Sequence, residues 1–332
     1  MTGIRLGALL AAIVFLAGCG EEEGSKTVVE RNHPRELREV RVSINDYVGP
    51  EHAGLLMAEA NGYFADAGFE VIADPPANPT WPVRYVLSDL VDSDFSVSHQ
   101  PQVAISTDNG KPIVAVGSLI SHPTAALIWL KESGIGSISA LKGKVVGVPG
   151  LPFQVRFLEE LLSRANLGPE DVKVKYVGYE LVPSLVKGRV DAIFGGSAQL
   201  EGIELRSLGL EPVITPVRSL GIPDYEELVL IATTDLASRE PQFIQEFLAA
   251  LSRGTAAAIR NPQAVVREIE SHVEPRPVSS RKARRAQVEA ILPLLSPSGE
   301  MDESRVEGLA AWMHGEGMIR EEPPVSSLLA DE

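Results

Sequence analysis

Ten short apolar segments, separated by stretches with helical periodicity, constrain the fold of this chain more than any other feature. Several are continuous runs of aliphatic and β-branched residues, as expected for strands that helices cover on both faces. After about residue 235 the spacing becomes almost wholly helical and amphipathic. The pattern therefore predicts an α/β protein. The expected strands cover residues 40–44, 69–74, 94–98, 113–120, 125–131, 144–150, 172–178, 191–196, 211–217 and 227–233.

Glycine and serine residues mark the expected ends of three helices. The helical stretch "EHAGLLMAEANGYF" reaches its end at Gly62, and "PFQVRFLEELLSRANLG" ends at Gly168, because glycine is the preferred residue just past a helix. Ser197 is a candidate N-cap for the helix that follows residues 191–196. In an α/β protein the ligand site is expected beyond the carboxyl ends of the strands.

Composition excludes several functions. A chain of 332 residues is long enough for two domains, and its net charge of -15 argues against nucleic-acid binding. The sequence contains no phosphate loop, dinucleotide fingerprint or "GxSxG" elbow. Its six histidines include no pair at metal-ligand spacing. We therefore expect no metal, no cofactor and no catalytic residues.

The N-terminus indicates export. Arg5 precedes the apolar run "LGALLAAIVFLAG", which is too short to span a bilayer comfortably, and the only cysteine, Cys19, follows it. The motif "LAGC" resembles the bacterial lipoprotein signal. That resemblance implies a signal peptide over residues 1–18, lipid on Cys19 and a flexible tether over residues 19–39. The chain would then lie on the outer face of the cytoplasmic membrane, on the periplasmic or cell-surface side. A plain secretory peptide or membrane anchor with an incidental cysteine is the alternative.

Several longer segments together resemble one family. They are "HAGLLMAEANGYFADAGFEV", "DFSVSHQPQV", "ISHPTAALIWLKESGIGSISALKGKVVGVPG", "GYELVPSLVKGRVDAIFGG" and "GIPDYEELVLIA". They are similar to substrate-binding proteins of ABC importers, in the branch that binds sulfonates, nitrate and thiamine pyrimidines. The likeness is strongest to lipoproteins that bind thiamine-precursor pyrimidines such as formylaminopyrimidine or hydroxymethylpyrimidine, and it covers about residues 40–320.

The resemblance implies a two-lobed periplasmic-binding-protein fold of type II, each lobe a mainly parallel sheet flanked by helices. Lobe one would comprise residues 40–121 plus 226–332 and lobe two residues 122–225, with the ligand in the cleft between them. Hinges would fall near His122–Pro123 and Gly221–Asp224. The implied partners are a small heteroaromatic ligand and an ABC permease with its ATPase, and we expect a monomer.

Residues that follow strands of the first expected lobe are candidates for the cleft. Related pyrimidine binders carry an Asp-aromatic pair after the first strand, which makes Tyr47 a stacking platform; ordinary half-buried packing is the alternative. This loop departs from the family's "WxPNxxH" and reads "YVGPEH". His99 and Gln100 occupy positions where relatives often have Tyr-Gln, and both can donate and accept hydrogen bonds.

Four further residues are expected at the ligand. Trp81 is either a stacking wall or a core anchor, and His122 makes either a hinge hydrogen bond or a ligand contact. Gly150 precedes a helix whose first turn offers free backbone N–H groups. Tyr225, at the second hinge, would close over the ligand. The cleft-facing segments are poor in Lys and Arg, which counts against a strongly anionic ligand.

Glu201 is the expected grip on the ligand. Glycines 195 and 196 let the backbone turn where side chains would crowd the cleft. Related pyrimidine binders carry a carboxylate at the position of Glu201, where it can accept two N–H bonds from an aminopyrimidine. Alternatively, Glu201 and Glu204 form an acidic helix face beside Arg206; in the ligand-binding reading Glu204 is exposed.

The resemblance leaves rival functions. Riboflavin, a sulfonate or nitrate could be the ligand in the same transport role. Thiamine-pyrimidine synthases share the fold, but they carry a cysteine-rich motif for iron, and this chain has Cys19 alone. A sensor domain is a third alternative, although no signalling segment is apparent after the last helix. We expect a binding protein rather than an enzyme.

Overall fold

The computed structural model describes residues 36–74, 82–88, 93–272 and 280–330. Residues 36–332 belong to one compact unit, and the described part of it contains two five-stranded sheets. The first sheet has the order β2 (Phe69–Asp74), β1 (Arg38–Ser43), β3 (Phe95–Ser98), β10 (Leu228–Thr233) and β4 (Ile113–Ile120). The second has the order β7 (Lys173–Tyr176), β6 (Val145–Val148), β8 (Ala192–Ser197), β5 (Ala125–Leu130) and β9 (Pro212–Pro216).

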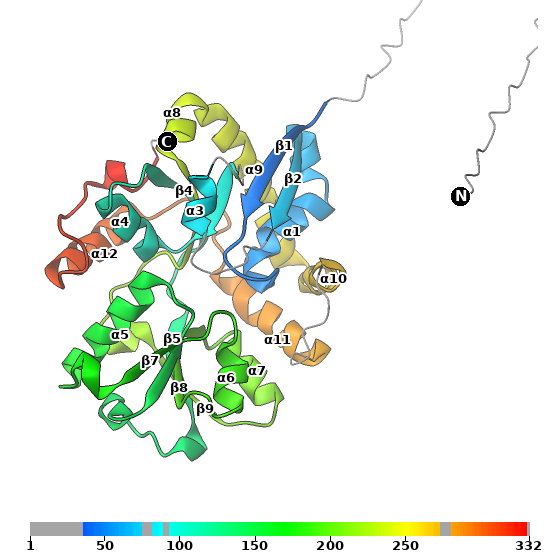
Figure 1. Cartoon of the computed structure of the whole chain (residues 1–332). Helices are drawn as coiled ribbons and strands as arrows, with labels where there is room; N and C mark the ends of the chain where they lie inside the picture. The colour runs from blue at the N-terminus through cyan, green and yellow to red at the C-terminus, as the bar shows by residue number, and fades with distance from the viewer. Residues whose placement is uncertain (1–35, 75–81, 89–92, 273–279, 331–332) are drawn as a thin grey trace, which may run out of the picture. The chain divides into compact units, whose positions relative to one another are not determined.

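Helices flank both sheets. In Figure 1 the second sheet carries the helices α5 (Pro152–Arg164), α6 (Leu181–Val186) and α7 (Glu201–Ser207). The remaining helices are α1 (Ala53–Ala60), α2 (Tyr63–Ala67), α3 (Pro82–Val86), α4 (Gln100–Asp108), α8 (Thr234–Arg239), α9 (Pro241–Arg260), α10 (Pro262–His272), α11 (Arg281–Ile291) and α12 (Glu303–Gly315). No helix among the described residues is both long and apolar enough to cross a membrane.

Both sheets are mainly parallel, as the resemblance implies, and each is mixed because it contains one antiparallel strand. In the first sheet β1 runs parallel to β2 and β3, but β10 is antiparallel to β3 and β4. In the second, β6 is parallel to β7 and β8, but β5 is antiparallel to β8 and β9. The cause is the path of the chain, which crosses between the sheets twice. Because β5 and β10 each follow a crossing, they start at the edge where the parallel strands end.

The strands lie where the sequence predicts them, within two residues at either end, but some helix ends differ. Gly62 has the predicted left-handed conformation after α1, with φ 69°. The helix α5 ends earlier than expected, at Arg164, because Asn166 takes the left-handed position with φ 57°. Ser197 is the last residue of β8 rather than a helix cap, although its Oγ still accepts a hydrogen bond from the Leu200 N–H at 3.0 Å.

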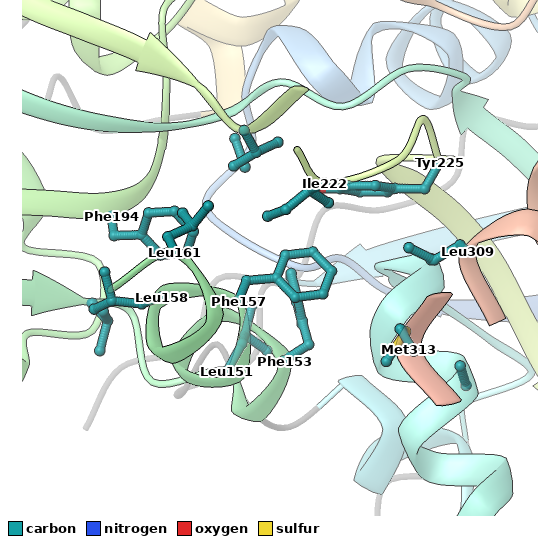
Figure 2. Close-up of a cluster of buried hydrophobic side chains, with 14 of the residues drawn as sticks. Leu151, Phe153, Phe157, Leu158, Leu161, Phe194, Ile222, Tyr225, Leu309 and Met313 are labelled. Atoms are coloured by element: carbon teal, nitrogen blue, oxygen red, sulfur yellow. The ribbon is translucent and has the colours of Figure 1, made fainter. Parts of the chain in front are cut away.

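A buried aromatic cluster joins elements from both sheets. Figure 2 shows Phe153 and Phe157 of α5 in one cluster with Tyr225, which lies just before β10, and with Met313 of α12. The ring centroid of Phe157 lies 6.0 Å from that of Tyr225 and 5.3 Å from that of Trp312. Edge-to-face ring pairs of this kind stabilise a core by about 0.5–1.5 kcal/mol beyond the area they bury. The chain's return segment to the first sheet is therefore anchored between α5 and α12.

Candidate ligand-binding site

A cavity opens where strands of both sheets end, within the compact unit. Residues on the side of the first sheet are Asn45, Asp46, Glu51, His99, Ile120, Glu227, Leu228 and Ile291. On the side of the second they are Thr124, Pro149, Leu151, Gln154, Gly178, Tyr179, Leu181, Gly195, Ser197, Leu200 and Glu201. This is the position that α/β topology favours for a ligand. The described lining includes four carboxylates and no Lys or Arg, in agreement with the cation-poor cleft that the sequence indicates.

Glu201 has a strongly raised pKa. It opens helix α7, and its Oε2 accepts a hydrogen bond from the backbone N–H of Ser197 at 2.6 Å. Burial raises the pKa of Glu201 to about 7, with the Asp46 carboxylate adding to the rise and the Ser197 N–H opposing it. Near neutral pH the group therefore gains or loses a proton readily. A carboxyl group of this kind suits a ligand that offers two N–H groups side by side.

The two glycines before Glu201 make room for cavity side chains, as the sequence predicts. Gly195 has φ 94°, and a Cβ there would lie 2.5 Å from Nε2 of Gln154. A Cβ on Gly196 would lie 3.0 Å from Cγ of Glu201. Side chains at either position would displace a polar group that borders the cavity. Glu204, expected to be exposed, is half-buried and borders a neighbouring cavity.

Tyr47 lies at this neighbouring cavity, which shares Asp46, Glu51, Leu200 and Glu201 with the first. Its side chain is 44% exposed, and its ring centroid is 4.9 Å from that of Tyr179, with the rings tilted by 55°. Tyr179 itself lines the first cavity. The two rings are therefore in contact, and each lines a cavity that Glu201 also lines, Tyr47 from the loop after β1 and Tyr179 from the loop after β7. Sequence reasoning names Tyr47 but misses Tyr179.

His99 is fixed by a buried carboxylate. Its Nδ1 lies 3.1 Å from Oε1 of Glu227 and 2.9 Å from the Glu227 carbonyl oxygen. The other carboxylate oxygen accepts the backbone N–H groups of Thr124 and Ala125. Burial alone would raise the pKa of Glu227, but the bonds and charge of His99 and these two N–H groups hold it below its usual value. His99 thus connects the cavity to the start of β5.

The irregular loop after β1 presents an amide to the cavity. His52 is buried, and burial lowers its pKa to about 3, so its ring is neutral. Because Nδ1 accepts the Gly49 N–H at 3.2 Å, Nε2 carries the proton and donates to Oδ1 of Asn45 at 2.9 Å. This arrangement fixes which end of the Asn45 amide faces outward: its NH₂ group remains for other partners.

Several predicted site residues lie elsewhere. Gln100 is buried, and its Oε1 accepts the Glu226 N–H at 2.7 Å while its Nε2 donates to the Val306 carbonyl at 3.4 Å. Tyr225 has no exposed surface and packs in the aromatic cluster, so its ring does not reach the cavity. Both side chains are therefore buried in the protein interior.

The remaining predicted positions are His122, Gly150, Trp81 and Cys19. His122 is not among the lining residues, and its Nδ1 lies 2.8 Å from Oδ2 of Asp224. Gly150 occupies the turn between β6 and α5 with φ 110°, and its neighbours Pro149 and Leu151 line the cavity. Trp81 and Cys19 fall outside the described residues.

Other features give no competing site. No cluster of three or more metal-ligating side chains occurs among the described residues. A larger cavity of about 450 Å³ lies against β4, α8 and α9. None of its described lining comes from the second sheet, so relative movement of the sheets cannot close it. The cavity that contains Glu201 is therefore the candidate site.

Comparisons with known proteins show which proteins this chain resembles. The model of a family described as NMT1/THI5 like matches residues 49–265. The chain is 31% identical over 263 residues to the formylaminopyrimidine-binding protein of Halalkalibacterium halodurans, an alignment that covers 79% of this chain and 77% of that protein. It is 26% identical to a 4-amino-5-hydroxymethyl-2-methylpyrimidine phosphate synthase of Legionella pneumophila, with 68% and 70% covered.

Solved structures support the fold independently. The periplasmic aliphatic sulphonate-binding protein SsuA from Escherichia coli superposes with a TM-score of 0.67 at 13% identity, covering 88% of this chain and 97% of that chain. An identity this low carries information on the fold alone. It confirms the predicted α/β fold of periplasmic binding proteins.

Proposed function

This chain belongs to the NMT1/THI5-like family, and on that premise we propose that it is an extracytoplasmic solute-binding lipoprotein of an ABC importer. Its ligand is a thiamine-precursor pyrimidine. The observation that carries the proposal is Glu201, a carboxyl group with a raised pKa in a cavity whose described lining holds no Lys or Arg. The relative from Halalkalibacterium halodurans, named for formylaminopyrimidine binding, supports the ligand class.

Glu201 grips the amidine edge of the ligand. An aminopyrimidine presents an exocyclic N–H beside a ring nitrogen that is basic enough to take up a proton. A carboxyl group at this edge forms two parallel hydrogen bonds and shares the proton with the ring, and such charge-assisted pairs are strong and selective. Tyr47 and Tyr179, with ring centroids 4.9 Å apart, provide flat apolar surface for the heterocycle.

Capture proceeds by closure of lobe one (residues 40–121 plus 226–332) on lobe two (residues 122–225). A ligand shifts the equilibrium toward the closed form only by its differential affinity for that form. Contacts from both sheets provide this difference, since Asn45 and His99 come from one side and Glu201 and Tyr179 from the other. His99 and Glu227 link the ligand to the backbone of Thr124 at the first crossing.

Lipid on Cys19 would hold the protein at the outer face of the membrane, with residues 19–39 as a tether. The permease and its ATPase then receive the ligand from the closed form. No covalent step is required of the cavity. A synthase activity like that named for the Legionella pneumophila relative is disfavoured, because the resemblance to such enzymes implies a cysteine-rich iron motif and the sequence contains one cysteine.

Calorimetric titration of the full chain, purified in detergent, tests the proposal. The titrants are hydroxymethylpyrimidine, formylaminopyrimidine, thiamine, riboflavin, taurine and nitrate. We expect tight binding of the pyrimidine precursors and weak or no binding of riboflavin and the anions. Binding of riboflavin or taurine in preference to both pyrimidines would retain the transport role and refute the ligand class.

A further inference from the structure

Gln154 is a buried polar residue of the cavity, and its amide takes no part in the proposed grip of Glu201 on the ligand. It lies in the first turn of α5, its side chain is 3% exposed, and it lines the cavity that contains Glu201. Its Oε1 has no hydrogen-bond partner among the described residues and almost no exposed surface. A buried acceptor without a partner is costly. In a binding cavity, a ligand can supply the missing partner.

The backbone of β8 is shaped around this amide. A Cβ on Gly195 would come within 2.5 Å of Nε2 and 3.0 Å of Oε1 of Gln154. Gly196 makes the corresponding space for Glu201. The two side chains therefore lie against successive glycines and border the cavity at separate positions around the end of β8. A ligand held by Glu201 at one edge meets Gln154 with a different part.

The polarity of the cavity indicates which chemical group of the ligand faces Gln154. Its described lining contains the carboxylates of Asp46, Glu51, Glu201 and Glu227, and no Lys or Arg. Acceptors thus outnumber strong donors around the ligand. The Oε1 atom of Gln154 adds one more acceptor, and its complement is a donor such as an N–H group.

We propose that Gln154 is a specificity-determining residue whose Oε1 accepts an N–H from the substituent of the ligand, distinct from the amino group that Glu201 binds. This inference rests on the proposed function. It narrows the ligand class to aminopyrimidines whose substituent carries a hydrogen-bond donor, an N–H in the formylaminomethyl compound. A substituent that offers only an ether or ester oxygen leaves Oε1 unpaired and places two acceptors together.

A matched pair of ligands isolates this hydrogen bond. One is the pyrimidine with a formylaminomethyl substituent, and the other is the formate ester in which oxygen replaces that N–H. The full chain in detergent should bind the formamide about ten- to a hundredfold more tightly than the ester, because the ester leaves the buried Oε1 of Gln154 without a hydrogen-bond donor. Equal affinities for the two ligands would overturn the inference.

Two variants separate recognition from structure. Gln154→Met removes the acceptor and keeps an unbranched side chain, so it should bring the formamide-to-ester affinity ratio close to one. A ratio unchanged in Gln154→Met, in a variant whose thermal midpoint shows that it is folded, would contradict the inference. Gln242→Met, which changes an exposed glutamine of α9 paired with Glu246, should leave both affinities unchanged.

The outcomes distinguish the two proposals. If the wild-type chain binds neither pyrimidine, the proposed function fails. If it binds both with the same affinity, the proposed function stands and the role of Gln154 fails. Gln154→Glu provides a second check, since its carboxylate still accepts at the same reach and should retain the preference for the formamide that Gln154→Met loses.

Discussion

The Nδ1 atom of His122 lies 2.8 Å from Oδ2 of Asp224, so one contact joins the two segments by which the chain passes between its sheets. Arg305 of α12 reaches the same place. Its Nε is 3.5 Å from Oδ2 of Asp224, and its Nη1 is 2.6 Å from Oε1 of Glu226. Both crossings are therefore tied to each other and to α12. Movement between the sheets must rearrange these contacts.

Arg305 should matter most among these contacts for stability. Its partner Glu226 has no exposed side-chain surface, and a buried carboxylate that loses its counter-ion is strongly destabilising. We expect Arg305→Met to lower the free energy of unfolding by about 3 kcal/mol. Urea denaturation measures it. Arg156→Met is the control, because its pair with Glu159 is exposed and should contribute less than about 1 kcal/mol. Equal losses in the two variants would contradict this account.

The raised pKa of Glu201 predicts a pH dependence of stability. The group has a pKa of about 7 in the folded state against 4.5 as the ordinary value, so the folded chain binds more protons than the unfolded chain between these values. Stability should then fall as pH rises from about 4.5 to 7, by about 3 kcal/mol at most. Glu201→Gln should abolish this part of the dependence. Urea denaturation at pH 4.5 and pH 8 measures it, and an identical pH difference in both proteins would refute it.

Gly195 should tolerate no larger residue. Gly195→Ala strains a backbone with φ 94° and brings a Cβ against the Gln154 amide, which should cost about 1–3 kcal/mol of stability and weaken ligand binding. Gly188→Ala is the matched control, because Gly188 has φ 63° with open space around it. It should lose stability without losing affinity. Similar affinity losses in both variants would exclude a specific effect at the cavity.

Tyr47 should contribute to binding more than to folding. Because its side chain is 44% exposed, Tyr47→Ala should change the unfolding free energy by less than about 1 kcal/mol. Loss of a stacked ring should lower the affinity for an aminopyrimidine by roughly two- to tenfold. Tyr176→Ala, at an exposed tyrosine of β7, should leave affinity unchanged. Calorimetric titration distinguishes the two, and an unaltered affinity in Tyr47→Ala would remove this ring from the site.

The positions of strands could be predicted because each strand is a local run of apolar residues. The reversed direction of β5 and β10 could not be predicted, because it results from the crossings, which no local pattern records. His99 and Glu201 follow strand ends directly, and the structure places both on the cavity. The proposed lobe boundaries remain a prediction.

Distant partners explain why two of the predicted site residues do not line the cavity. Gln100 and Tyr225 also lie near strand ends, but Gln100 pairs with Glu226 and Tyr225 packs against Phe157, in both cases on segments far away in the sequence. Sequence reasoning does not identify Tyr179 or Gln154 as site residues. A survey of every polar or aromatic side chain within a few residues of each strand end would have found them.

Calorimetric titration of Glu201→Gln with formylaminopyrimidine decides whether Glu201 binds the aminopyrimidine. Glu204→Gln is the control, because Glu204 lies on the same helix and does not line the main cavity. We expect at least a tenfold loss of affinity in Glu201→Gln and little change in Glu204→Gln. Wild-type affinity in a folded Glu201→Gln variant would contradict it.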